Sequence, residues 1–255
     1  MILIDTHTHL YASEFDADRD KVIENAKKLG IQRFYLPNVD SSSIPGMLAL
    51  ETKYPENCFA MMGLHPCSVK ANYKEELDIV EKWLQERKFV AIGEIGMDLY
   101  WDKTFIEEQK QVFRQQMEWA LHYQIPIVIH CREAFDEIYE VLKSFQKLPR
   151  GIFHCFSGNL EQANKIIDLG GFKLGIGGVV TFKNAGLDKV MEQLDMIHFV
   201  LETDSPYLAP VPFRGKRNES GYLMNVAQKI SEIKKISPEE VATITTDNAN
   251  SIFSY

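Results

Sequence analysis

Paired cysteines and an export segment are both missing from this 255-residue sequence. Its four cysteines, Cys58, Cys67, Cys131 and Cys155, include no Cys-x-x-Cys pair and follow no spacing typical of a disulfide framework. The small disulfide-rich secreted class is therefore excluded, and we expect reduced thiols, as in a cytoplasmic protein. Met1 leads directly into a strand-like segment, without the successive charged, apolar and cleavage regions of a signal peptide.

Long apolar runs and an excess of positive charge are absent as well. No apolar stretch approaches the ~20 residues that a membrane-spanning helix needs, so we expect a soluble cytoplasmic protein that does not contact the membrane. The 28 lysines and arginines are outnumbered by 36 aspartates and glutamates, giving a formal net charge of -8. A broad basic surface that binds nucleic acid by counterion release alone is therefore excluded. A nucleic-acid substrate would need local positive charge, from metal ions or a few basic loops.

Repeats, low-complexity tracts and linkers rich in proline, glycine and serine are also missing. With 45% hydrophobic residues the chain can bury a sizeable core, and we predict that residues 1–255 form a single domain. No segment indicates an obligate protein partner. Residues 209–221 are predicted as a long loop, whose Lys216 and Arg217 are either solvated charges or substrate contacts. Residues 237–253 are predicted as a closing pair of helices.

Short strand-like runs alternate with helix-like segments along the whole chain. The strand-like runs cover residues 1–5, 31–37, 58–62, 89–94, 127–130, 151–154, 172–176 and 197–201. Between them, apolar residues recur at helical spacing, as in Val22, Ile23, Ala26 and Leu29 before Gly30. Eight such units in a chain of this length are typical of an α/β protein of the TIM type, a closed (β/α)8 barrel. Active sites of such barrels lie at the C-terminal ends of the strands.

The alternative of an open doubly wound sheet is disfavoured by the residues after the first strand. Such a sheet usually carries a glycine-rich nucleotide turn there, whereas this chain has His7 and His9 in "DTHTHL". Alternate side chains of an extended backbone point to the same side, so both imidazoles could reach one cation. By itself, however, a His-x-His pair is more often structural than ligating.

Further ionisable side chains stand at the ends of later predicted strands. Glu94 ends the fourth strand, His130 the fifth and His154 the sixth, and Asp204 follows the eighth. Each alone could cap a helix or be a satisfied core histidine. Polar groups among apolar strand residues are nevertheless costly unless they are paired or bind a metal. Because all these ends meet at one face of a barrel, we predict a site for divalent cations there.

The predicted metal ligands outnumber those that one tetrahedral cation needs. They are His7, His9, Glu94, His130, His154 and Asp204. Four histidines and two carboxylates favour a binuclear site with two cations per chain and Glu94 as a bridge. Imidazole and carboxylate suit Zn²⁺ or Mn²⁺, whereas Mg²⁺ prefers more oxygen ligands. The sequence leaves Mg²⁺, Mn²⁺ and Zn²⁺ open.

Two more residues at the same face are predicted to bind substrate. His65, in "GLHP", follows the third strand and either contacts substrate or orients a metal ligand, with a purely structural loop role as the alternative. Arg132, two residues after His130, could hold a phosphate or carboxylate through a bidentate contact. It could equally pair with Glu133 or Asp136.

The motifs together resemble those of the TatD-type metal-dependent deoxyribonucleases, within the amidohydrolase-like metal barrels. The matching stretches are "DTHTHL", "GLHP", "GEIGMDLYWDK", "PIVIHCREAFDE", "FHCFSG", "LETDSPYLAP" and "RGKRNES", which span nearly the whole chain. The resemblance implies that the predicted ligands bind divalent metal. It also implies a cytoplasmic enzyme that degrades DNA as a 3′ to 5′ exonuclease favouring single strands. Departures are small, since Met97 replaces a common leucine and Ser220 a frequent proline.

A mechanism follows in which the cations activate a water and Asp204 accepts its proton as the general base, with Glu94 the second catalytic residue. The water oxygen then attacks a phosphodiester of DNA. The same barrel and ligands suit an amide or ester hydrolase, including an aminoacyl-tRNA deacylase, because fold does not fix function. A non-catalytic, metal-stabilised scaffold is a third alternative, but a complete ligand set with Asp204 as a spare base argues against it.

Overall fold

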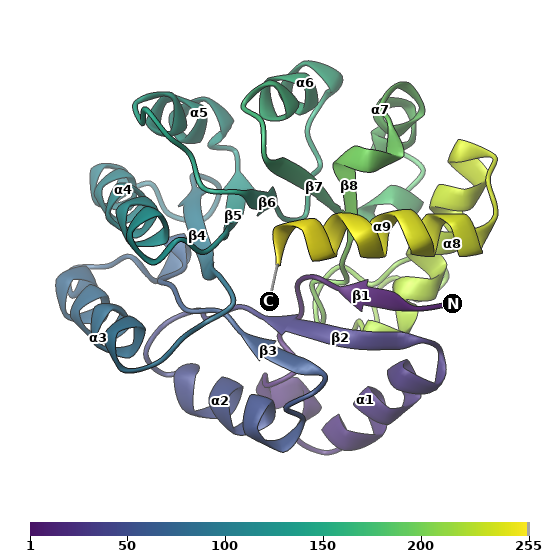
Figure 1. The fold of residues 1–255 in the computed structure, drawn as a ribbon, viewed down its shortest axis with the longest axis horizontal. Helices are drawn as coiled ribbons and strands as arrows, with labels where there is room; N and C mark the ends of the chain where they lie inside the picture. The colour runs from purple at the N-terminus through teal and green to yellow at the C-terminus, as the bar shows by residue number, and fades with distance from the viewer. Residues whose placement is uncertain (254–255) are drawn as a thin grey trace.

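Parallel strands alternate with helices throughout the computed structural model, which describes residues 1–253 (Figure 1). The strands are β1 (Leu3–Asp5), β2 (Ile31–Leu36), β3 (Cys58–Ala60), β4 (Ile92–Asp98), β5 (Ile127–Arg132), β6 (Gly151–Phe153), β7 (Phe172–Ile176) and β8 (Phe199–Leu201). The helices are α1 (Arg19–Lys28), α2 (Ile44–Lys53), α3 (Tyr73–Glu86), α4 (Ile106–Tyr123), α5 (Phe135–Lys143), α6 (Leu160–Asp168), α7 (Leu187–Gln193), α8 (Leu223–Lys234) and α9 (Pro238–Ile252). Among the described residues, none of the helices has the length and apolar character that a membrane crossing requires.

The strands close into a barrel through two seams. Hydrogen bonding gives a three-stranded sheet, β1-β2-β3, and a five-stranded sheet from β4 to β8, parallel throughout. Between β3 and β4, the Gly93 N–H donates to the Met62 carbonyl at 3.0 Å. Between β8 and β1, the Thr6 N–H donates to the Leu201 carbonyl at 3.0 Å. The (β/α)8 barrel is thus confirmed, and the open sheet is excluded.

Helix α9 closes the N-terminal end of the barrel, which leaves the opposite end for a site. Asn248 on α9 donates to the Phe199 carbonyl at 2.8 Å, at the start of β8. Phe253 stacks on Tyr35 of β2 with ring centroids 3.9 Å apart, and Figure 1 shows α9 lying across the strands. The buried apolar residues inside the barrel and under α9 form one cluster: Ile4, Tyr35, Met61, Ala91, Val128, Ile152, Val200, Ala249, Ile252 and Phe253.

The prediction for residues 237–253 was wrong, because this tail is one helix rather than two. Ser237 caps α9 by accepting the Glu240 N–H at 3.2 Å, and Pro238 begins the helix. The capping therefore starts a helix at Ser237, and nothing interrupts it before Ile252. A pair does exist, but its first member is α8, which precedes the predicted tail.

Strand β4 also departs from its prediction. It continues to Asp98, so Glu94 lies inside the strand rather than at its end. The pairing with β5 shifts between Ile92 and Ile95, and Gly93 and Glu94 fall within this irregularity. Irregularities of this kind redirect side chains and are frequent beside active sites. Here the irregularity lies where Glu94 reaches the C-terminal end of the barrel.

Candidate metal centre

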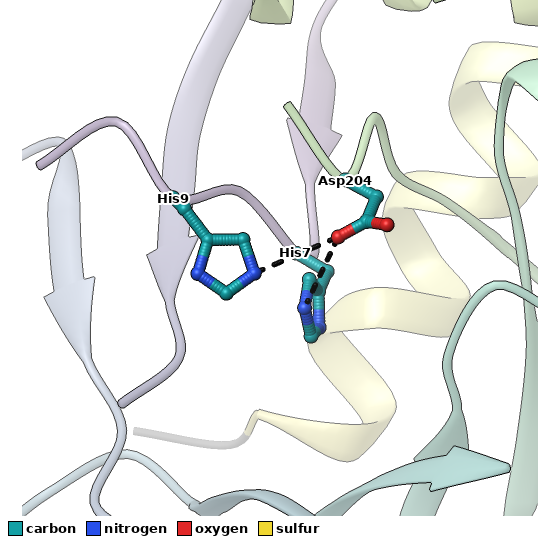
Figure 2. Close-up of side chains that lie close together, drawn as sticks. All are labelled: His7, His9 and Asp204. Atoms are coloured by element: carbon teal, nitrogen blue, oxygen red, sulfur yellow. Dashed lines mark ion pairs between the residues drawn. The ribbon is translucent and has the colours of Figure 1, made fainter. Parts of the chain in front are cut away.

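The segment after β1 and the turn after β8 bring two histidines and an aspartate together (Figure 2). The Nε2 atoms of His7 and His9 each lie 3.6 Å from Asp204 Oδ1. Both rings reach the same carboxylate because alternate side chains of an extended backbone point to the same side. The side chain of Thr8, between them, points the other way, toward Ser205. The Asp204 N–H donates to the His7 carbonyl at 2.9 Å, which fixes the two segments to each other.

Glu94 lies among five imidazoles. Its Oε2 is 3.1 Å from His7 Nε2 and 3.8 Å from His9 Nε2. Its Oε1 is 2.8 Å from His130 Nδ1, 2.7 Å from His154 Nε2 and 3.3 Å from His65 Nε2. The side chain is 2% exposed, so water contributes little to its solvation. The structure therefore brings all six predicted ligands together, with Glu94 touching residues from four different βα units.

The arrangement of donor atoms fits divalent cations. Three groups have ligand atoms within 4.8 Å of one another: His7 with His9 and Asp204, His7 with Glu94 and His154, and His65 with Glu94 and His130. Both ring nitrogens of His7 are buried without a hydrogen-bond partner in the described part of the chain. Such unsatisfied atoms are rare in proteins, and a cation bound at Nε2, the nitrogen that faces Glu94 and Asp204, would satisfy one of them. The first two groups consist of predicted ligands alone, and Glu94 also contacts His130, so the geometry can hold more than one ion.

The protonation states of the buried groups follow from their neighbours. Burial raises the pKa of Glu94, but His154, His65 and His7 outweigh burial and hold this pKa well below its ordinary value. Burial lowers the pKa of His154, yet the nearby Glu94 and Glu202 raise it well above the usual range. Burial, together with His154, lowers the pKa of His7. His7 is thus a neutral imidazole, the form that ligates metal.

Sequence reasoning missed three residues that lie behind the predicted ligands. Asp98 Oδ2 lies 2.8 Å from His130 Nε2 and the Tyr11 hydroxyl lies 2.9 Å from His9 Nδ1, and hydrogen-bonded partners of this kind fix the ring orientation and tautomer of a metal-binding histidine. Glu202 Oε1 lies 3.6 Å from His154 Nδ1, which is an ion-pair distance rather than a hydrogen bond. A signal was present for the two acids, because Asp98 and Glu202 stand beside predicted ligands in "GEIGMD" and "LETD".

His65 lies beside Glu94 in the candidate metal centre, and its Nε2 acts as a hydrogen-bond donor. The Cys67 N–H donates to His65 Nδ1 at 3.0 Å, so the lone pair of Nδ1 is occupied. Burial lowers the pKa of His65 and favours the neutral ring, whose proton must then sit on Nε2. This Nε2 faces Glu94 Oε1 at 3.3 Å. His65 can therefore donate to Glu94 or to a substrate oxygen, in keeping with either predicted role.

Of the basic residues predicted as possible substrate contacts, Arg132 and Arg217 differ in whether they already form ion pairs. Arg132 is exposed, and none of the ion pairs among residues 1–253 includes it, so its proposed pairing with Glu133 or Asp136 is not seen. Arg217, in contrast, forms two hydrogen bonds of 2.8 Å with the Asp18 carboxylate and another of 2.9 Å with Glu219. Arg217 therefore ties the loop to the segment before α1, and Arg132 stays available for an anion.

Comparison with known proteins places this geometry among metal-dependent hydrolases. The family model described as TatD related DNase matches residues 4–254. The uncharacterized metal-dependent hydrolase YabD of Bacillus subtilis (strain 168) is 39% identical over 254 residues, covering 99% of each chain. The crystal structure of YjjV, a TatD homologue from Escherichia coli K12, has a TM-score of 0.93 and 30% identity, covering 99% of this chain and 98% of that one.

A more distant structure shares the fold alone. The phosphotriesterase homology protein of Escherichia coli has a TM-score of 0.73 and 16% identity, covering 99% of this chain and 98% of its own. The barrel architecture is therefore shared by proteins whose sequences have diverged widely.

Proposed function

Because the chain belongs to the TatD-related DNase family and is a metal-dependent hydrolase, we propose that it cleaves phosphodiester bonds of single-stranded DNA, working from the 3′ end. The observation that carries the proposal is the convergence of five imidazoles on the buried Glu94 carboxylate, beside Asp204. Such a site is open to substrate at the C-terminal end of the barrel. We place the enzyme in the cytoplasm.

The six sequence-predicted residues are proposed to hold two divalent cations, Mg²⁺, Mn²⁺ or Zn²⁺. They are His7, His9, Glu94, His130, His154 and Asp204. Bound cations would lower the pKa of water and neutralise charge on phosphoryl oxygens. Glu94 would be shared by both ions, because its two oxygens face different histidines, His7 on one side and His130 and His154 on the other.

Asp204 is proposed as the general base. Burial raises its pKa, but His9, His154 and His7 outweigh burial and keep this pKa below its ordinary value, so the carboxylate is ionised at neutral pH. Its side chain is 14% exposed, against 2% for Glu94, which leaves one edge open to water and substrate. An ionised carboxylate at the open edge of the site is placed to accept the proton of an attacking water.

His65 and Arg132 are proposed to bind the substrate. The proton on His65 Nε2 can be donated to a phosphoryl oxygen, since its other nitrogen already accepts the Cys67 N–H. The exposed guanidinium of Arg132 offers a charge-assisted contact to a phosphate. Arg132 and the cations would supply locally the positive charge that a chain of net charge -8 lacks, and the neutral His65 would add a hydrogen bond.

Digestion of 5′-labelled single-stranded DNA with Mg²⁺, Mn²⁺ or Zn²⁺, beside a chelator control, tests the proposal. We expect a ladder of shortened strands that needs metal and disappears in Asp204→Asn. Asp247→Asn makes the same chemical change at an exposed position of α9, at the other end of the barrel, and should stay active. DNA left intact with every metal would overturn the nuclease function. Amide and aminoacyl-ester substrates would then show whether the same centre cleaves those bonds instead.

A further inference from the structure

Two aromatic rings stand exposed at the rim of the metal centre, directly after β4. Tyr100 is 48% exposed and Trp101 is 68% exposed. Their ring centroids are 4.8 Å apart at an angle of 85°. The Arg132 guanidinium lies over both rings, 3.9 Å from the Tyr100 centroid and 5.1 Å from that of Trp101. The three side chains form a continuous cationic and aromatic surface, here called the rim platform.

One carboxylate joins the rim platform to the predicted metal ligands. Asp98 Oδ1 accepts the backbone N–H groups of Tyr100 at 3.0 Å and Trp101 at 3.1 Å. The other oxygen, Oδ2, lies 2.8 Å from His130 Nε2. The Asp98 side chain is 1% exposed, so this linkage is buried. Asp98 therefore fixes the backbone of Tyr100 and Trp101 relative to the His130 ring, because the same carboxylate binds both.

We propose that the rim platform, Tyr100, Trp101 and Arg132, stacks a nucleobase of single-stranded DNA next to the phosphate held at the metal centre. The proposal rests on the proposed nuclease function and names how that site grips its substrate. Aromatic faces accept every base, because each base has a π face, and an arginine beside them adds attraction to the backbone phosphate. Arg132 suits this task because it forms no ion pair among the described residues.

Other readings of these rings explain less. Single exposed aromatic residues are normal on protein surfaces, but this pair is anchored by a buried carboxylate that also holds His130. A protein partner needs about 800 Å² on each side, which two side chains cannot supply. The rings adjoin the centre where a phosphodiester would lie, so the nucleotide next to that phosphate is the occupant that reaches both.

The test compares Trp101→Ala, Trp101→Phe and wild type on an ordinary strand and on strands with one abasic unit at the last or the penultimate 3′ nucleotide. Ile197→Ala, which truncates a 53% exposed apolar side chain before β8, is the control. We expect Trp101→Ala to lower kcat/KM on the ordinary strand about 5- to 150-fold, through KM, in line with the measured strength of base stacking. Trp101→Phe, which keeps an aromatic face, should lose less than Trp101→Ala, and the Ile197→Ala control should stay near wild type.

The abasic strands separate stacking from a general loss of structure. On the strand that lacks the stacked base, wild type should lose the same factor, and Trp101→Ala should lose nothing further. An unchanged KM for Trp101→Ala, or equal losses on ordinary and abasic strands, would overturn the rim platform while leaving the nuclease function intact.

Tryptophan fluorescence gives a readout that does not need turnover. The ordinary strand should quench the emission of wild type but not the remaining emission of Trp101→Phe. A wild type that cleaves no strand but is quenched in this way would overturn the nuclease function and support the rim platform. A wild type that neither cleaves nor is quenched would overturn both.

Discussion

Replacing Asp98 by asparagine should disable His130 without changing the size of either side chain. Asp98 Oδ1 accepts two backbone N–H groups, at 3.0 and 3.1 Å, and an asparagine would keep its carbonyl oxygen there. Its NH₂ group would then face His130 Nε2, which lies 2.8 Å from Oδ2 in the native protein. Two donors cannot share that contact, so the proton must move from Nε2 to Nδ1. Nδ1 is the nitrogen that faces Glu94 at 2.8 Å, and once protonated it cannot ligate a metal.

The expected loss of metal affinity in Asp98→Asn follows from the loss of one charge-assisted hydrogen bond and of the His130 tautomer that can ligate a metal. Partners of this kind typically contribute 10- to 100-fold to metal affinity or activity, or about 1.4–2.7 kcal/mol. Titration of the metal-free protein with Mn²⁺ or Zn²⁺, in competition with a chromophoric chelator, measures the affinity directly. We expect Asp98→Asn to weaken binding by that factor and to lower the metal-dependent hydrolysis rate in parallel.

A matched control lies four residues away. Asp102, in the loop after β4, is 38% exposed and pairs with Lys70 at 2.6 Å, and no ion pair among residues 1–253 joins it to a predicted ligand. Asp102→Asn should leave the metal affinity unchanged. If Asp98→Asn bound metal as tightly as wild type, within about twofold, the orientation of His130 by Asp98 would be refuted.

Three further outcomes follow from burial and space. A Cβ on Gly175 would overlap Oε2 of the fully buried Glu202, so Gly175→Ala should displace Glu202. The free energy of unfolding, measured in urea, should fall by about 1–3 kcal/mol, and hydrolysis should slow. Wild-type values for both would contradict this. A Cβ on Gly46 in α2 meets its nearest atom at 3.7 Å, so Gly46→Ala should raise the free energy of unfolding by about 0.5–1 kcal/mol, and a decrease would show hidden crowding. Burial raises the pKa of Cys58 to about 12, so iodoacetamide at pH 8 should modify this thiol only after unfolding, as mass spectrometry of the native and unfolded protein can check.

The fold could be predicted because its signal is local and repeated. Each strand is a short apolar run, and each following helix shows its own spacing, so the alternation survives errors at individual boundaries. The boundaries themselves depend on distant partners. β4 continues past Glu94 because Gly96, Met97 and Asp98 pair with β5, a contact that a sequence window around Glu94 does not contain. The prediction of two helices in the tail was wrong although the deciding signal is local. Ser237 caps α9, and a single helix runs from there to Ile252.

The site divides in the same way. The six predicted ligands could be found because the ends of parallel strands meet at one end of any such barrel, whatever the details of packing. Asp98 and Glu202 stand in the predicted motifs, but the histidine that each faces could not be predicted, because the contact of Asp98 with His130 joins β4 to β5 and that of Glu202 with His154 joins the ends of β8 and β6. Those pairs depend on register and side-chain direction. The contacts of Arg132 could not be predicted either. Only the structure shows that it stacks on Tyr100 and does not pair with Glu133 or Asp136.

The charge distribution bears on how such a chain would handle a polyanion. Acidic residues outnumber basic ones by 36 to 28, and two basic residues near the site are already paired, Lys70 with Asp102 and Arg217 with Asp18. Under the proposed function, attraction to DNA would come from the cations and Arg132, within one or two phosphates of the scissile bond. A contact this short releases few counterions, at about 0.7 per phosphate on a single strand, and so gives a shallow dependence of KM on salt. It also gives little hold on the rest of the strand, which favours release after each cut over long processive runs.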